Sequence, residues 1–291
     1  MNKNKCIIIL SERSSGSSAL QDYLVKFTPA RHVEKSQHFE YETVYWSKAA
    51  SIMAMPQIKM VDSRVPLGYK QAKSELIKLL KDNVKDFEIP PLDEALIFDG
   101  WRALCGRFAP IFLEKSPHHL CEWSALQLIL KCMDRLSETD FLIVGLVRNP
   151  MSIIYSHFDR WKTIPAKIEK QWIIAYKNLL KLKEILGDKL VVVRYEDLSK
   201  SNIPLQPIFE FCSADAAKAE EGFFHARSLH KWKDDRLFGF SLSDEAVNLA
   251  QQLGYNESEL TGKPYFLAPL VHHALNFFYK SLKLLKSLLK K

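Results

Sequence analysis

Five short apolar runs alternate along the chain with longer amphipathic stretches. This alternation is typical of a parallel β-sheet whose strands are joined by crossover helices. We therefore expect an α/β fold in which a central parallel sheet is flanked by helices. The expected strands are residues 5–10, 30–34, 110–113, 141–147 and 189–193, and the expected helices are residues 16–26, 125–135, 168–186 and 244–253.

Residues 50–105 contain no apolar run that must join this sheet. Two amphipathic stretches lie between residues 70 and 105, separated by a turn-rich segment at 88–91. We expect this region to form a helical cap over the site. Because the chain shows neither internal repeats nor linker-like composition, we predict one domain over residues 1–268, with the cap at about 50–105, followed by a helix over 269–291.

The composition is that of a globular protein with a basic excess. Of the 291 residues, 47% are hydrophobic and 26% are charged, which excludes global disorder. The net charge is +7, but residues 269–291 contain five lysines and no acidic residue, which leaves only +2 for the rest of the chain. The basic excess therefore describes mainly the C-terminal segment.

The C-terminal segment has two distinct faces at helical spacing. One face is apolar and the other carries Lys280, Lys283, Lys286 and Lys290; the apolar positions are Val271, Ala274, Leu275, Phe278, Leu282, Leu285 and Leu289. Such a helix is suited to the interface of an anionic membrane, to packing on its own domain, or to a second subunit in a homodimer. An anionic membrane is a better candidate than nucleic acid.

The five cysteines, at positions 6, 105, 121, 132 and 212, are odd in number and lack CxxC spacing. We expect reduced, buried thiols rather than a disulfide framework or a zinc site. The chain contains no uncharged apolar run of membrane-spanning length and no segment that resembles a signal peptide. These features predict a cytoplasmic protein, free or peripheral on the inner face of the membrane.

The first expected strand leads into a loop rich in hydroxyl groups, residues 11–18 (Ser-Glu-Arg-Ser-Ser-Gly-Ser-Ser), and then into a helix. Such a loop directs free backbone N–H groups and the positive end of the helix dipole toward one point, where a phosphate or sulfate fits. A well-capped helix without a ligand is the alternative. The loop is not a Walker A motif, because no lysine follows Gly16, and a GxGxxG motif is absent.

A second candidate anion site follows the buried run at 141–147. The chain continues as Arg148-Asn149-Pro150 into a helix that contains Ser156. Open α/β sheets bind ligands at the carboxyl ends of their strands, where Arg148 is expected. The alternative is an ordinary surface turn.

Together these motifs resemble the sulfotransferases that use 3′-phosphoadenosine 5′-phosphosulfate (PAPS). Residues 11–18 resemble the family's 5′-phosphosulfate loop, with one extra serine between Arg13 and Gly16, and Arg148-Asn149-Pro150 with Ser156 resembles its 3′-phosphate motif. Three further elements are similar and occur in the family's order: residues 114–117 (Glu-Lys-Ser-Pro), 194–198 (Arg-Tyr-Glu-Asp-Leu) and 230–233 (His-Lys-Trp-Lys).

The resemblance implies a P-loop-like sulfotransferase fold and an enzyme that moves a sulfuryl group by in-line transfer. The donor is PAPS, the product is adenosine 3′,5′-bisphosphate (PAP), and no metal is needed. The acceptor is a hydroxyl or amine of a carbohydrate, a glycolipid or another small molecule. Competing functions are a P-loop-like kinase or nucleotide-binding protein and, ranked lower, a nucleic-acid-binding protein, for which the basic residues lack the usual arrangement.

The resemblance also implies roles for individual residues. Arg13 would lie near the bridging oxygen, and the 5′-phosphate would be held by Arg13, Ser14, Ser15, Gly16, Ser17, Ser18 and Ala19. The remaining donor contacts would come from Arg148, Ser156, Lys231, Trp232 and Lys233. Lys115 would contact the transferring group or the acceptor. The expected general base is Glu34, then His38, then His32, with a polar loop as the alternative account of that segment.

Overall fold

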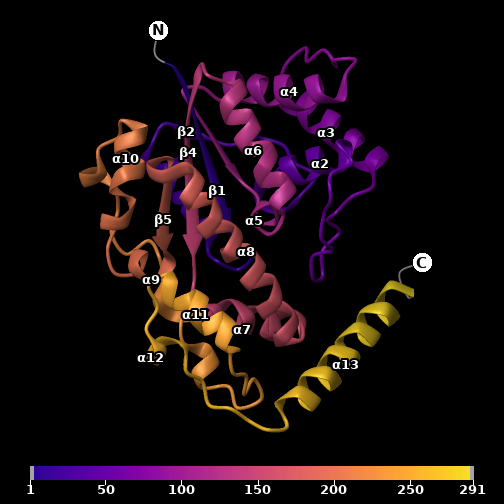
Figure 1. Cartoon of the computed structure of the whole chain (residues 1–291), viewed down its shortest axis with the longest axis vertical. Helices are drawn as coiled ribbons and strands as arrows, with labels where there is room; N and C mark the ends of the chain where they lie inside the picture. Colours follow the sequence, from indigo (N-terminus) through magenta and orange to yellow (C-terminus); the bar gives the residue numbers. More distant parts are fainter. Residues whose placement is uncertain (1–2, 289–291) are drawn as a thin grey trace. The chain divides into compact units, whose positions relative to one another are not determined.

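The central sheet has five strands, and every neighbouring pair is parallel (Figure 1). The structure is a computed structural model that describes residues 3–288. All five expected strands are present, in the order β2-β3-β1-β4-β5. Their bounds are β1 (Asn4–Ser11), β2 (Ala30–Arg31), β3 (Ile111–Lys115), β4 (Thr139–Val147) and β5 (Leu190–Arg194). The predicted α/β class is confirmed.

The central position of β1 explains its continuous apolar run. It pairs with β3 on one edge and β4 on the other, and residues Cys6 to Leu10 are all fully buried. A strand that is covered on both faces needs no alternation of polar and apolar side chains. The strand expected at 30–34 is shorter than predicted, since only Ala30 and Arg31 pair with β3.

The four expected helices are confirmed, and they correspond to α1, α6, α8 and α11. The C-terminal segment forms α13; Leu289 and Lys290 lie outside the described residues. The helices are α1 (Ser17–Phe27), α2 (Tyr45–Ile52), α3 (Tyr69–Asn83), α4 (Asp93–Arg107), α5 (His118–Cys121), α6 (Trp123–Arg135), α7 (Pro150–Trp161), α8 (Pro165–Leu186), α9 (Tyr195–Leu198), α10 (Gln206–Cys212), α11 (Asp244–Gln252), α12 (Glu257–Leu260) and α13 (Ala268–Leu288).

The segment expected to form a cap contains α3 and α4 and, within its fully described range 50–105, no strand. Helix α4 packs against β1 and β3. Its fully buried Trp101 lies 4.8 Å from Tyr45, 4.6 Å from Trp46 and 5.2 Å from Phe112, measured between ring centroids. This part of the segment therefore contributes to the core that supports the sheet.

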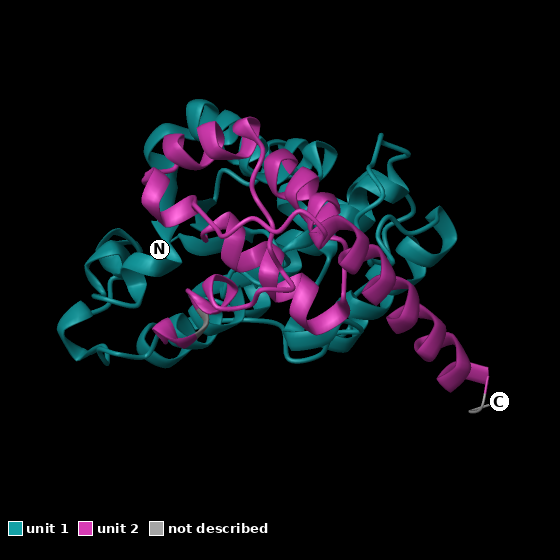
Figure 2. Ribbon diagram, turned by 90° about the horizontal axis from the view of Figure 1, so that it is seen from below, with its two compact units in different colours: residues 1–147, 175–224 teal, residues 148–174, 225–291 magenta. Residues whose placement is uncertain are grey.

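The chain divides into two compact units (Figure 2). Unit 1 comprises residues 1–147 and 175–224 and contains the whole sheet; unit 2 comprises residues 148–174 and 225–291 and contains α7 and α11–α13. Within residues 3–288, no helix is both long enough and apolar enough to cross a membrane.

Candidate functional site

The loop from β1 to α1 contains two residues in the left-handed region, Ser14 with φ 65° and Gly16 with φ 91°. A Cβ atom at Gly16 would lie 2.4 Å from Cε2 of Tyr195, so only glycine fits between the loop and this ring. The loop is also held by Ser15, whose buried Oγ lies 3.3 Å from the Tyr176 hydroxyl. The motif at 194–198 therefore braces the loop through Tyr195.

The first turn of α1 offers its N–H groups without an internal competitor. It contains no acidic residue, and no side chain caps Gly16 at its start. The first N–H groups of a helix have no intrahelical partner and carry the positive end of the dipole. An anion is therefore favoured at this point of unit 1.

Lys115, at the end of β3, places a buried positive charge beside this turn. Its side chain is 0% exposed, and its Nζ lies 3.1 Å from Ser18 Oγ and 3.3 Å from the Glu40 carbonyl oxygen. The ammonium also lies 3.7 Å from the Glu40 carboxylate, which accepts a hydrogen bond from Ser18 Oγ. The Glu40 carboxylate thus lies beside both Ser18 and Lys115, so an anionic oxygen has two partners at this point.

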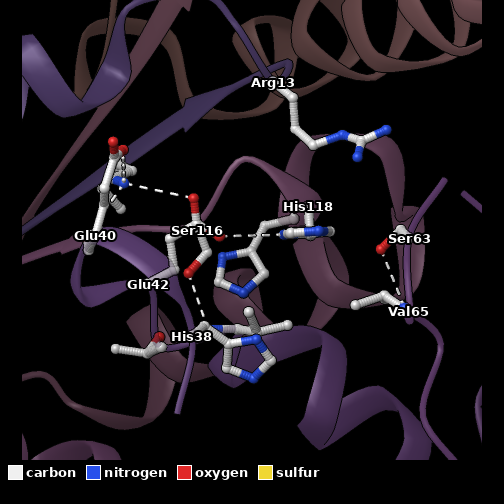
Figure 3. A network of polar contacts seen from close by, with 12 residues as sticks. Arg13, His38, Glu40, Glu42, Ser63, Val65, Ser116 and His118 are labelled. Atoms are coloured by element: carbon white, nitrogen blue, oxygen red, sulfur yellow. Dashed lines mark hydrogen bonds and ion pairs between the residues drawn. The ribbon is translucent and has the colours of Figure 1, made fainter. Parts of the chain in front are cut away.

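Glu42 is the second acid beside Lys115, and the sequence reasoning missed it. Its Oε1 lies 3.5 Å from Lys115 Nζ and its Oε2 lies 3.6 Å from His118 Nδ1 (Figure 3). Burial raises the pKa of Glu42 above its ordinary value, although the Lys115 ammonium opposes this shift. A carboxylate with a raised pKa is a stronger base than an exposed one.

His118 completes this cluster as a neutral ring. Burial, the guanidinium of Arg13 and the neighbouring His119 lower the pKa of His118 to about 3. At neutral pH the His118 ring is therefore uncharged. The positive charge beside the Glu42 carboxylate is then the Lys115 ammonium.

Glu114 and Ser116, on either side of Lys115, hold the segment that carries Glu42. Glu114 Oε1 accepts hydrogen bonds from Thr43 Oγ1 at 2.7 Å and from Ser116 Oγ at 2.5 Å. Ser116 Oγ in turn accepts from the Val44 N–H at 2.9 Å. Within the motif at 114–117, Lys115 thus faces Ser18 and Glu40, while its neighbours Glu114 and Ser116 hold the segment that carries Glu42.

His119 strengthens this brace from α5. The Trp46 N–H donates to His119 Nε2 at 3.1 Å, and the other ring nitrogen, Nδ1, lies 3.4 Å from Glu114 Oε2. Burial alone would raise the pKa of Glu114, but His119, Ser116 and Thr43 outweigh it, and the pKa of this carboxyl is lowered.

The three bases expected from sequence lie in different surroundings. Glu34 is 63% exposed and pairs with Arg107 at 2.9 Å. The His38 Nε2 lies 3.2 Å from Glu75 Oε2, and burial together with Lys48 lowers the pKa of His38. The His32 ring packs 4.5 Å from the Tyr41 ring. Among the described contacts, Lys115 pairs with Glu42 and with none of these three candidates.

Arg13 turns toward a different segment. Its guanidinium donates to the backbone carbonyls of Val61 and Asp62, the latter at 3.4 Å. Its Nε lies 4.0 Å from Glu12 Oε1, a fully buried carboxylate that also accepts from Cys121 Sγ at 2.9 Å. Figure 3 shows Arg13 directed away from Glu42. The side chain thus lies against residues 61–62, and its place near the bridging oxygen stays a prediction.

In unit 2, Asn149 fixes the start of the helix that carries Ser156. Its Oδ1 accepts from the Met151 N–H at 2.9 Å, and its Nδ2 donates to the Glu259 carbonyl at 2.7 Å. Asn149 thus caps α7 and ties it to α12, while Pro150 suits the first helical position. Arg148 is 7% exposed and Ser156 is half-buried on α7.

Trp232 is a buried anchor of unit 2. Its Nε1 donates to the Leu229 carbonyl at 3.0 Å, and the same carbonyl accepts from Ser152 Oγ of α7 at 2.6 Å. Lys231 and Lys233 on either side are exposed. A cavity of about 680 Å³ in this unit contains none of the predicted site residues, whereas one of about 470 Å³ is lined by Trp232, Lys233, Asp235, Arg236, Leu237, Lys263, Pro264 and Tyr265.

The smaller cavity has three basic side chains and one acidic side chain in its lining, so it favours an anionic ligand. Within residues 3–288, no group of three or more His, Cys, Asp or Glu side chains is arranged to hold a metal ion.

Comparisons with known proteins identify the fold. No protein-family model matches the chain, and no curated protein matches it. Among solved structures, the sulfotransferase domain of the olefin synthase of Synechococcus PCC 7002 is similar with a TM-score of 0.57 and 19% identity, over 88% of this chain and 96% of that chain. A sulfotransferase from Alicyclobacillus acidocaldarius has a TM-score of 0.42 and 12% identity, over 85% and 88% of the two chains. The chain has the P-loop-like fold of the sulfotransferases.

Proposed function

We propose that this chain is a sulfotransferase that moves a sulfuryl group from PAPS to a hydroxyl or amine acceptor. The observation that carries the proposal is the site at the start of α1, where buried Lys115 and Ser18 already hold a carboxylate oxygen. A sulfuryl group presents similar anionic oxygens. The sulfotransferase fold of the chain supports the same function.

The donor would bind with its 5′-phosphate against the N–H groups of residues 14–19. Gly16, whose positive φ and contact with Tyr195 exclude a side chain, fixes the backbone turn from which these N–H groups would point at the phosphate. The Glu40 carboxylate would leave Ser18 and Lys115 when the donor binds. Lys115 would then stabilise the charge that develops on the sulfuryl oxygens and on the leaving oxygen.

We assign the general base to Glu42 instead of Glu34. In the transfer step, the acceptor O–H gives its proton to the Glu42 carboxylate and its oxygen forms a bond to sulfur. The bond between sulfur and the bridging oxygen breaks, and PAP leaves with that oxygen. Glu42 suits this role because burial raises its pKa and the brace from Glu114 and Ser116 fixes its position.

The 3′-phosphate would be held by Arg148 and Ser156, with Lys231 and Lys233 closing over the nucleotide and Trp232 anchoring their segment. Arginine suits this task because its planar fork binds two phosphate oxygens at once. We propose a carbohydrate, glycolipid or other small-molecule acceptor and a cytoplasmic location; the described cysteines are all free and buried.

Thermal unfolding tests donor recognition directly. PAP at about 100 times its dissociation constant should stabilise the folded protein by about 2.7 kcal/mol, without magnesium. ATP with magnesium should have a much smaller effect, and the reverse ranking would favour a kinase or another nucleotide-binding function.

Two variants localise the effect. Arg148→Ala, just before α7, should abolish the stabilisation by PAP, whereas Arg160→Ala, the same change at an exposed position within α7, should leave it intact. If PAP stabilises Arg148→Ala as strongly as the unaltered protein, the assignment of the 3′-phosphate site is wrong.

A further inference from the structure

Helix α13 packs on unit 2 through its polar face. The His272 Nε2 lies 2.7 Å from the Phe238 carbonyl oxygen, and Asn276 Nδ2 donates to the Lys162 carbonyl at 2.8 Å. These two side chains are 3% and 9% exposed. An amphipathic helix of a globular protein normally packs through its apolar face, so this orientation is the reverse of the usual one.

The apolar face of α13 is exposed as a consequence. Successive residues of a helix are about 100° apart, and at this spacing the exposed apolar residues fall on the side opposite His272 and Asn276. They are Leu270 (69%), Phe277 (69%), Phe278 (64%), Leu282 (58%), Leu284 (62%), Leu285 (56%) and Leu288 (59%). A contiguous apolar surface of this kind marks an interaction site.

The charge of the helix identifies the partner. Lys280, Lys283 and Lys286 lie on the polar side, and residues 269–291 include no acidic residue. A second copy of this helix would be equally basic, with no acid in residues 269–291 to offset the charge, so like-charge repulsion opposes pairing of the two helices. An anionic lipid surface suits both faces of the helix. Its phosphates attract the lysines, and the boundary between headgroups and acyl chains covers the leucine and phenylalanine side chains.

We propose that α13 docks this protein on the surface of an anionic phospholipid bilayer. The helix lies in the interface, with its apolar face at the boundary between headgroups and acyl chains and its lysines at the phosphates. Although α13 has 21 residues, it is not apolar enough to cross a bilayer. The proposal concerns binding alone and stands independently of the transfer reaction.

Flotation of the full-length protein with vesicles tests this docking. We expect binding to vesicles of phosphatidylcholine with about one third phosphatidylglycerol, weak binding to phosphatidylcholine alone, and loss of binding as salt is raised. The variant Phe278→Ser/Leu285→Ser removes two apolar side chains without changing charge and should weaken binding roughly a hundredfold, at about tenfold per side chain. Replacement of Lys280, Lys283 and Lys286 by Gln should weaken it by a similar factor, at roughly fivefold per lysine.

Ile203→Ser is the matched control, because Ile203 is 75% exposed in unit 1 and lies outside α13. Its binding should equal that of the unaltered protein. Failure of the unaltered protein to float with anionic vesicles at low salt would overturn the proposal. So would a dimer, observed by analytical ultracentrifugation, that Phe278→Ser/Leu285→Ser converts to monomers, because the face would then belong to a second copy.

Discussion

Two regions of the molecule differ from the usual distribution of side chains. The end of the sheet near Lys115 buries a charge, whereas helix α13 exposes large apolar side chains. At the sheet, an ammonium group is fully buried among oxygens of Ser18, Glu40 and Glu42. On α13, leucine and phenylalanine side chains are more than half exposed. A charge is buried only where partners compensate its loss of water, and a large apolar surface is exposed where a partner outside the chain covers it. In our proposals the first region therefore serves the transfer reaction and the second serves contact with lipid.

The largest effect is expected at the buried acid. Glu42→Gln keeps the shape of the side chain but cannot accept a proton, so kcat for sulfuryl transfer should fall about a thousandfold. Release of PAP, with PAPS and acceptor saturating, measures this change. In the unaltered protein kcat should rise with pH through the pKa of Glu42, which burial places above its ordinary 4.5.

Glu34→Gln is the matched control for this variant, since Glu34 is 63% exposed. It should change kcat less than twofold, roughly the size of effects at exposed sites. A large loss in Glu34→Gln together with normal turnover in Glu42→Gln would reverse our assignment of the base.

The second prediction concerns the strained loop beside the same site. Gly16→Ala should destabilise the fold by about 3 kcal/mol, because it combines a left-handed φ with a clash against Tyr195. Gly187→Ala also has a positive φ but meets no atom within 4 Å, so it should cost only about 1 kcal/mol. Urea unfolding measures both, and equal costs would show that the Tyr195 contact does not constrain the loop.

The third prediction is a pH dependence of stability at Glu122, which lies in the same unit. Burial raises the pKa of Glu122 to about 7, although a hydrogen bond from Gln57 opposes the shift. Because this folded-state pKa lies above the unfolded value of 4.5, the folded state retains the proton longer and loses stability as pH rises from 4.5 through 7. The full loss should amount to about 3.5 kcal/mol, at about 1.4 kcal/mol per pKa unit.

Glu122→Gln should remove this loss, which urea unfolding at about pH 5 and about pH 8 will measure. If the variant and the unaltered protein lose the same stability between the two pH values, Glu122 is not the group that titrates.

The smallest effect is expected on α13. Phe278→Ser/Leu285→Ser, the pair that weakens vesicle binding, should change the free energy of unfolding in solution by less than about 0.5 kcal/mol, because both side chains are already exposed. Urea unfolding without lipid checks this value. A cost of several kcal/mol would mean that the apolar face packs within the protein, and the contrast between the two regions would disappear.

The succession of strands and helices along the chain was predictable, because buried parallel strands are continuous apolar runs. The runs in β1 and β4 and the periodic helices α6, α8 and α11 carry this signal locally. The strand β2 was overestimated, since its pairing depends on the register with β3 and not on its own residues. The packing direction of α13 was also beyond sequence reasoning, because His272 and Asn276 recognise carbonyls of residues distant along the chain.

The site was predictable where local sequence determines it and not where distant contacts do. Residues 11–18 and 148–150 carry local signals for a turn into a helix, and a helix begins at the end of each segment. The position of Glu42 depends on Thr43 and Val44 meeting Glu114 and Ser116 about seventy residues later, as their hydrogen bonds show. The one available signal was a pair of acids, Glu40 and Glu42, close to the segment in which the base was expected.

The central claim is that the chain transfers a sulfuryl group from PAPS. The direct measurement incubates the full-length protein with PAPS carrying ³⁵S and a panel of carbohydrate, glycolipid and small hydroxyl acceptors, without magnesium. We predict that label moves to at least one acceptor class and that PAP forms in equal amount. Absence of label on every acceptor, together with transfer of the γ-phosphate from magnesium-ATP to the same panel, would contradict the claim.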